Sequence, residues 1–143
     1  MTNPSLPSTS CIARFNCLPF WVDERGNMFP EMWFPTTDKK FGLAASVHAY
    51  PCDDLDDAQS AGERWASRKK TEPKKLLGWG RFQVSDINDM TSAKYPDQRL
   101  EAVSDPTKND KNHAAIIHWQ DECFNQIMAG ELASRGKYIP SIR

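Results

Sequence analysis

The sequence predicts an α+β fold, with a single small mixed sheet and two helices packed on it. The chain has 143 residues, the length of one average domain. Two segments repeat apolar residues at helical spacing, and the runs between them are short, rich in β-branched and aromatic residues, and bounded by turn-forming residues. One globular domain is therefore expected over residues 11–143. Residues 1–10, with two prolines and three serines, are expected to form a flexible tail.

The first part of the domain is expected to alternate extended segments with turns. Residues 11–22 are apolar and aromatic but are interrupted by Pro19, which predicts a short strand followed by an irregular edge. The polar run 23–27 is typical of a turn. Residues 28–37 hold two prolines and three aromatic residues, so a packed extended loop is favoured over a helix.

The middle of the chain predicts a strand and the clearest helix. Residues 41–50 alternate in hydrophobicity, as a half-buried strand does. The helix follows, capped by Asp53 or Asp54 and ending near Lys69.

Two further strands are expected before the last loop. Residues 76–84 favour a strand in which glycines flank Trp79, so that another backbone or a ligand can approach closely there. Ser85 is expected to cap a short turn through residue 90, and residues 100–104 predict a brief strand.

The C-terminal part predicts a loop, a strand and a second helix. Residues 105–112 have loop composition, and residues 113–119 indicate a mostly buried strand. Asp121 suits the start of the following helix, and Gly136 suits its end. The apolar stripe expected to pack this helix on the sheet contains Cys123, Phe124, Ile127, Met128 and Leu132.

Composition excludes several classes of protein. The net charge of −1 excludes a polybasic, histone-like role, and no apolar run is long enough to span a membrane. The first ten residues carry neither a basic residue nor an apolar run, so no secretory signal is expected and a cytoplasmic location is predicted. The cysteines form no Cys-x-x-Cys pair and are expected to be reduced, structural thiols: Cys11, Cys17, Cys52 and Cys123.

Two charged clusters are candidate ligand sites, each with a plainer explanation. The acidic run 53–57 offers oxygen ligands for Mg²⁺ or Ca²⁺, but acidic residues at a helix start also complement the helix dipole. The basic run 64–75 offers phosphate contacts, but it also suits a solvated helix end. For both charged clusters, we expect the helix-end explanation and not a ligand site.

The histidines suggest acid–base chemistry more than metal binding. His113 and His118 are five residues apart, so a strand would point them to opposite faces and they could not share a metal ion. No metal site and no cofactor are therefore expected. His113 lies where a polar loop enters a strand, which suits a general acid or base oriented by Asp105 or Asp110. The alternative is a histidine that only hydrogen-bonds the loop backbone.

The aromatic residues are the strongest candidates for a recognition surface. Five tryptophans are many for this length, and such residues dominate both protein cores and interface hot spots. The residues expected to bind a partner are Phe29, Trp33, Phe34 and Trp79.

Three stretches together with the C-terminal helix carry a resemblance to other proteins. The stretches are WFPTTDKKFGLAAS (33–46), GWGRFQVSDI (78–87) and SDPTKNDKNHAAI (104–116), and the helix ends in LASRG. They resemble a loose group of short bacterial proteins of unassigned activity, which share an aromatic-x-Pro-Thr segment and an Asp-Pro loop leading to His-Ala-x-Ile. Phe34 stands where that group commonly has an Arg, whereas Ser46 and Val47 match its Ser-Val pair. An arrangement with an Arg, a Ser and a late polar residue on separate strands would resemble the one in ADP-ribosyltransferase-like folds.

The sequence thus leads to two functional hypotheses. The first is a protein-binding module, which the resemblance implies to be an accessory, immunity or adaptor component of a bacterial toxin or defence system, with self-association as a further option. The second is a small nucleotide- or RNA-directed enzyme, ADP-ribosyltransferase-like or nuclease-like, in which His113 is the general acid or base. In this second hypothesis Trp79 stacks a base, and the phosphate is positioned by Arg14, Ser46 and Arg81.

Overall fold

The computed structural model describes residues 4–37, 45–52, 55–92, 94–108 and 110–142. Its strands are β1 (Cys11–Asn16), β2 (Thr36–Thr37), β3 (Ala45–Pro51), β4 (Gly78–Gln83), β5 (Glu101–Ser104), β6 (Ala114–Ile117) and β7 (Lys137–Pro140). Its helices are α1 (Leu55–Ser67), α2 (Val84–Asp89) and α3 (Glu122–Arg135), with 3-10 turns η1 (Pro19–Trp21) and η2 (Pro30–Trp33). The expected cap at Asp53 or Asp54 and the expected strand start at 41–44 lie outside the described residues.

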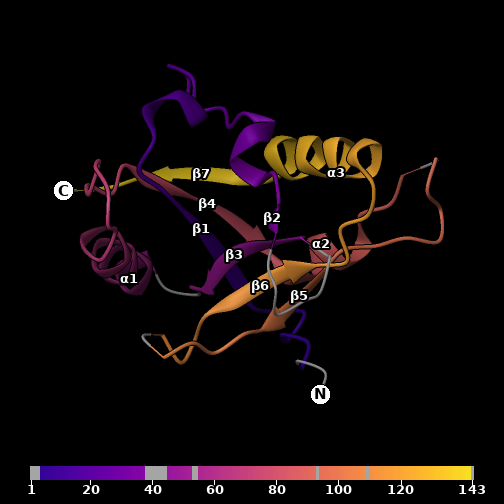
Figure 1. Cartoon of the computed structure of the whole chain (residues 1–143), viewed down its shortest axis with the longest axis horizontal. Helices are drawn as coiled ribbons and strands as arrows, with labels where there is room; N and C mark the ends of the chain where they lie inside the picture. The colour runs from indigo at the N-terminus through magenta and orange to yellow at the C-terminus, as the bar shows by residue number, and fades with distance from the viewer. Residues whose placement is uncertain (1–3, 38–44, 53–54, 93, 109, 143) are drawn as a thin grey trace.

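The strands form one twisted antiparallel sheet in the order β5-β6-β3-β1-β4-β7, and β2 pairs with the start of β3 (Figure 1). The α+β class is confirmed. Every pairing in the described part of the chain is antiparallel, so the sheet is antiparallel and not mixed as expected. Strands β2 and β7 were not predicted, and α2 was predicted as a turn. No helix in the described part of the chain combines the length and the apolar character needed to cross a bilayer.

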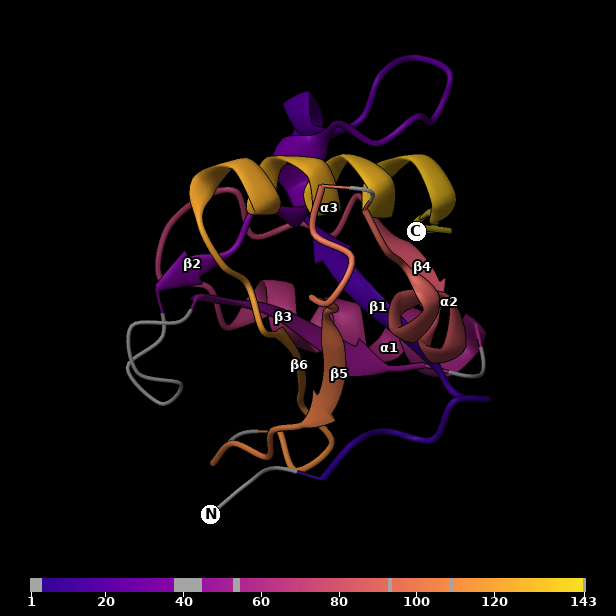
Figure 2. The same cartoon turned by 90° about the vertical axis from the view of Figure 1, so that its right-hand side faces the viewer.

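The two long helices cover opposite faces of the sheet (Figures 1 and 2). Neighbouring residues of a strand point to opposite faces, and in β1 Ile12 joins the core under α3 whereas Ala13 joins the core under α1. The core under α1 is the smaller one and consists mainly of residues from β1, β4 and α1 itself. Beside it, the same face of the sheet continues across β3, which carries His48 and Tyr50 there.

Helix α3 corrects part of the predicted apolar stripe. Asp121 caps it, accepting a hydrogen bond from the Phe124 backbone N–H at 2.8 Å. The side chains that it buries are Phe124, Met128, Ala129 and Leu132. Ile127 is only half-buried and Cys123 is exposed, because a helix turns by about 100° per residue and these two positions lie outside the buried face.

The structure also corrects two of the predicted recognition residues. Trp33 is fully buried: its ring meets Phe82 edge to face, and it packs so closely on Gly80 that a Cβ there would lie 2.6 Å from it. Trp79 is buried in the core under α1. Both side chains therefore belong to the core. The absence of a Cβ on Gly80 leaves room for the Trp33 ring, and the alternation of side chains along β4 points Trp79 into the core under α1. Phe29 and Phe34 remain exposed.

The N-terminal segment packs on the domain. The Leu6 N–H donates to the Ala102 carbonyl, the Ser104 N–H donates to the Pro4 carbonyl, and Ser5 forms a bridge with Val103. The described part of the expected tail therefore runs along β5.

Candidate functional site

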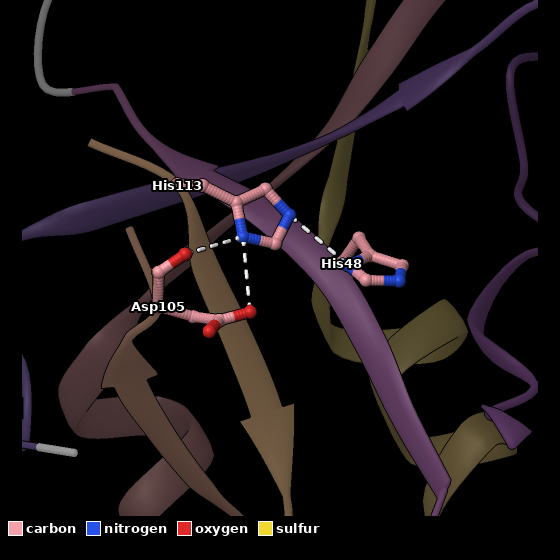
Figure 3. Close-up of side chains that lie close together, drawn as sticks. All are labelled: His48, Asp105 and His113. Atoms are coloured by element: carbon pink, nitrogen blue, oxygen red, sulfur yellow. Dashed lines mark hydrogen bonds and ion pairs between the residues drawn. The ribbon is translucent and has the colours of Figure 1, made fainter. Parts of the chain in front are cut away.

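The hairpin between β5 and β6 places a carboxylate beside a histidine. Ser104 pairs with Ala114, so Asp105 and His113 are the next residues to face each other, and the Asp105 N–H donates to the His113 carbonyl at 2.7 Å. The His113 Nδ1 lies 2.9 Å from the Asp105 backbone oxygen and 3.2 Å from its carboxylate Oδ2 (Figure 3). Both side chains are buried.

Strand β3 adds a second histidine to this pair. His48 is paired with Ala115, which lies two residues from His113 and therefore points to the same face of the sheet. The two imidazoles meet with 3.0 Å between His48 Nδ1 and His113 Nε2. His48 is exposed, and its other ring nitrogen points away from His113 (Figure 3).

The contacts of His113 fix the direction of the hydrogen bonds. Both neighbours of its Nδ1 are acceptors, so Nδ1 carries a proton. In the neutral ring, Nε2 is then an acceptor, and it accepts a hydrogen bond from the His48 Nδ1–H. The Nε2 of a neutral His48 is consequently the basic nitrogen. The order Asp105–His113–His48 thus links a buried carboxylate to an exposed imidazole base, an arrangement in which the inner groups orient the outer one.

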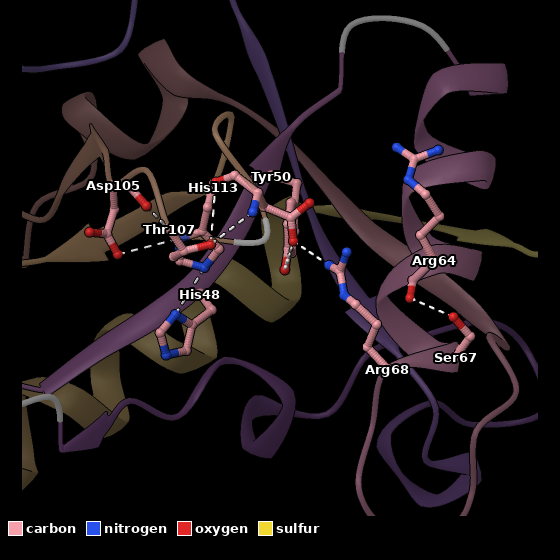
Figure 4. Close-up of polar contacts among 9 residues, drawn as sticks. His48, Tyr50, Arg64, Ser67, Arg68, Asp105, Thr107 and His113 are labelled. Carbon is pink, nitrogen blue, oxygen red and sulfur yellow. Dashed lines mark hydrogen bonds and ion pairs between the residues drawn. The ribbon is translucent and has the colours of Figure 1, made fainter.

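His48 opens into a hollow of about 360 Å³ between α1 and the sheet. The cations Arg68 and Lys69 line it from the end of α1, and Asp110 lines it from the β5–β6 loop. Arg68 forms an ion pair with Asp110, whose carboxylate also accepts a hydrogen bond from Tyr50 at 3.4 Å. Figure 4 shows the Arg68 side chain reaching toward Tyr50. A second hollow, of about 460 Å³, shares Tyr50 and Asp110 with the first and is also lined by Arg64, Lys111 and Asp57. Among the described lining residues of the two hollows, cations therefore outnumber carboxylates.

Arg14 lies where β3 changes partners. The start of β3 pairs with β2 and its end pairs with β1, and between them Arg14 donates to the His48 carbonyl at 3.0 Å and to the Met32 carbonyl at 2.9 Å. Burial lowers the pKa of this guanidinium to about 10, so it remains a cation at neutral pH. Within the described residues it forms no ion pair with a carboxylate, and its remaining N–H donors suit an anion in the hollow.

Aromatic rings form the rest of the lining. Tyr50 meets the His113 ring edge-on at 5.1 Å, and Trp65 of α1 lies beside Lys69, whose ammonium is 5.3 Å from the indole centre. Burial, with the Asp110 carboxylate next, raises the pKa of Tyr50 to about 12, so its phenol keeps its proton. The hollow combines cations, imidazoles and a ring surface on which a planar ligand can stack.

The predicted catalytic and phosphate-binding residues divide between this site and other parts of the fold. His113 and Arg14 belong to the site, and the aspartate beside His113 is Asp105. Ser46 is buried and Arg81 pairs with Ala13 and Lys137, and neither is among the described lining residues. Trp79 cannot stack a base because it is buried, whereas Trp65 is half-buried and lines the hollow.

His48 was not among the predicted site residues. His118 does not belong to the site, because it lies beyond the end of β6, where it contacts Glu101 at 3.0 Å. The useful signal was the period of two in SVHAY, which puts His48 and Tyr50 on one face of β3. Three residues, His48, Asp105 and His113, each offer one ligand atom, and these three atoms lie within 4.8 Å of one another. The three residues could therefore also hold a metal ion.

The cysteines fall into two groups. Cys11, Cys17 and Cys52 are buried thiols, whereas Cys123 is exposed at the start of α3. Hydrogen bonds from Lys94, at 3.1 Å, and from Tyr95 hold the pKa of the Cys123 thiol below its usual value. This thiol is far in the fold from the imidazoles, since α3 covers the opposite face of the sheet.

No family model matches the chain, and the curated proteins and solved structures compared with it give no match either. The resemblance to short bacterial proteins stays a prediction. The function is therefore inferred from the chemistry of the site.

Proposed function

We propose that the chain is a small phosphodiester-directed enzyme that uses acid–base catalysis, with RNA as its substrate class. The observation that carries the proposal is the hydrogen-bonded series Asp105–His113–His48, which ends on an exposed imidazole in a cationic hollow. Buried carboxylate–histidine pairs are the usual means of holding an imidazole base in one tautomer. Of the two histidines, His48 is the accessible one, so it is the proposed base and His113 positions it.

The cations define the substrate as an anion. Among the described lining residues, Arg14, Arg68 and Lys69 provide three positive charges against the one carboxylate of Asp110, which is paired with Arg68. Charge-assisted hydrogen bonds from guanidinium groups suit the non-bridging oxygens of a phosphate. Trp65 offers a ring for a nucleobase next to this phosphate position.

The described lining suggests that the nucleophile belongs to the substrate. It contains neither a serine nor a cysteine, and the Thr107 hydroxyl is engaged with Asp110. In the proposed step, His48 Nε2 removes the proton from a ribose 2′-hydroxyl, and that oxygen bonds to the adjacent phosphorus. The bond from phosphorus to the 5′-oxygen breaks, and the departing oxygen takes a proton from water. Arg14 and Lys69 stabilise the negative charge that gathers on the phosphate oxygens.

This mechanism predicts that cleavage requires the 2′-hydroxyl. A ribodinucleotide should give a 2′,3′-cyclic phosphate, visible by ³¹P NMR and chromatography, whereas the matching deoxyribodinucleotide should stay intact. Protein carrying His48→Asn, purified in parallel, controls for a contaminating ribonuclease. Failure to cleave either compound would contradict the enzyme, and equal cleavage of both would contradict the role of the 2′-hydroxyl.

A second function, binding of a protein surface, is supported by a different observation. Phe20 is 67% exposed, and Phe29 and Phe34 are exposed on the neighbouring segments. We propose that these phenylalanines, and not Trp33, form the contact, because exposed rings bury area on docking at low entropic cost.

The binding surface is tested first with a second copy of the chain as the partner. Sedimentation should show self-association that Phe20→Ser weakens about tenfold or more, with an unchanged melting temperature. Equal sedimentation of the two proteins as monomers would contradict self-association through Phe20.

A further inference from the structure

The two imidazoles have the spacing of a pair of metal ligands. A zinc ion binds histidine nitrogens at about 2.0–2.1 Å, so two such nitrogens on a tetrahedral ion lie about 3.3 Å apart. His48 Nδ1 and His113 Nε2 are 3.0 Å apart, so an ion bound to both would lie beside the line that joins them, and the exposed His48 ring has to turn to direct Nδ1 at it.

Asp105 supports the His113 imidazole from the buried side of the pair. A histidine that ligates a metal generally donates its other N–H to a carboxylate or a backbone carbonyl, which fixes the ring and makes its ligating nitrogen more basic. The Nδ1 of His113 has both kinds of acceptor, at 3.2 Å and 2.9 Å, and both come from Asp105. The buried side of the site is therefore already arranged for a metal on Nε2.

We propose that this pair binds a divalent ion of the late first-row series, with Zn²⁺ as the representative, and that the ion inhibits the acid–base reaction. His113 Nε2 and His48 Nδ1 are the protein ligands, Asp105 orients His113, and water or a phosphate oxygen fills the remaining positions. Imidazole nitrogens suit these ions, and affinity rises toward the copper and zinc end of the series.

The inhibition follows from the change of tautomer that metal binding requires of His48. In the metal-free pair, His48 Nδ1 carries the proton and Nε2 is the basic nitrogen. To ligate through Nδ1, the ring has to move this proton to Nε2, with no net gain or loss of protons by the neutral ring. The nitrogen that accepts the substrate proton then becomes a donor. This consequence, unlike the binding itself, rests on the proposed function.

Direct metal titration tests the site without any assay of activity. Wild-type protein titrated with Co²⁺ should develop the visible absorption bands of a site with nitrogen ligands, and Zn²⁺ should displace Co²⁺ at one ion per chain. His48→Asn should abolish the bands, and His118→Asn, which changes the exposed histidine at the other end of β6, should keep them. Asp105→Asn should weaken the affinity by about 10–100-fold, as is typical when a group supporting a metal ligand is lost.

Each outcome bears on one part of the proposal. Because His48 is exposed, its asparagine variant should fold, and metal binding that survives this substitution would overturn the site. Ribodinucleotide cleavage that Zn²⁺ leaves unchanged or accelerates at saturating occupancy would overturn the inhibition. Metal binding without any cleavage in the metal-free protein would contradict the proposed function and leave the metal site standing.

Discussion

Replacing Met128 with Asp should abolish cooperative folding. Met128 is fully buried between α3 and the sheet, in the larger core. An unpaired carboxylate at such a position costs several kcal/mol, an amount comparable with the whole stability of a domain, about 5–15 kcal/mol. Thermal unfolding followed by circular dichroism should therefore show no native transition for Met128→Asp.

The adjacent residue provides a matched control for this substitution. Ile127 is half-buried at the edge of the buried face of α3, so a carboxylate there keeps access to water. Ile127→Asp should keep a cooperative transition, with a melting temperature lowered by several degrees. If the two variants melt at the same temperature, the orientation of α3 on the sheet is wrong.

Replacing His48 with Asn should lower kcat/KM for the ribodinucleotide by about 10²–10⁴-fold, the usual contribution of a general base. The folded state should be little affected, because the side chain is exposed and asparagine retains an N–H donor to His113. The kinetic comparison should be made on samples with matched circular dichroism spectra and melting temperatures.

His118→Asn is the control for a general effect of losing an imidazole. His118 lies in the left-handed region at φ 77°, where asparagine is well tolerated, and the hollow does not include it among its described lining residues. This variant should retain wild-type kcat/KM. A His48→Asn enzyme as active as His118→Asn would remove His48 from the mechanism and leave the hollow, at most, a binding site.

The positions of the elements were largely predictable from local patterns. The helix ending at Arg135 was recognisable because Asp121 and Gly136 mark its ends and an apolar stripe lies between them. The α+β class followed from short β-prone runs around two helices. These features depend on neighbours in the sequence, and the structure has them because local propensity and tertiary packing agree.

The candidate site was only partly predictable. His113 and an aspartate partner were recognisable because both belong to one loop, and hairpin pairing brings its two ends together. Burial of Trp33 was not recognisable, because it depends on the missing Cβ of Gly80, which is 47 positions away in the sequence.

The class of the fold, the two long helices and the segment that supplies Asp105 and His113 could all be inferred from the sequence. The contribution of His48 to the site became apparent only from the three-dimensional fold. His48 and His113 are separated by 65 positions and meet because β3 pairs with β6 in one register. A shift of that register by one residue would point one imidazole to the opposite face of the sheet, and no local pattern fixes the pairing of strands so distant in the chain.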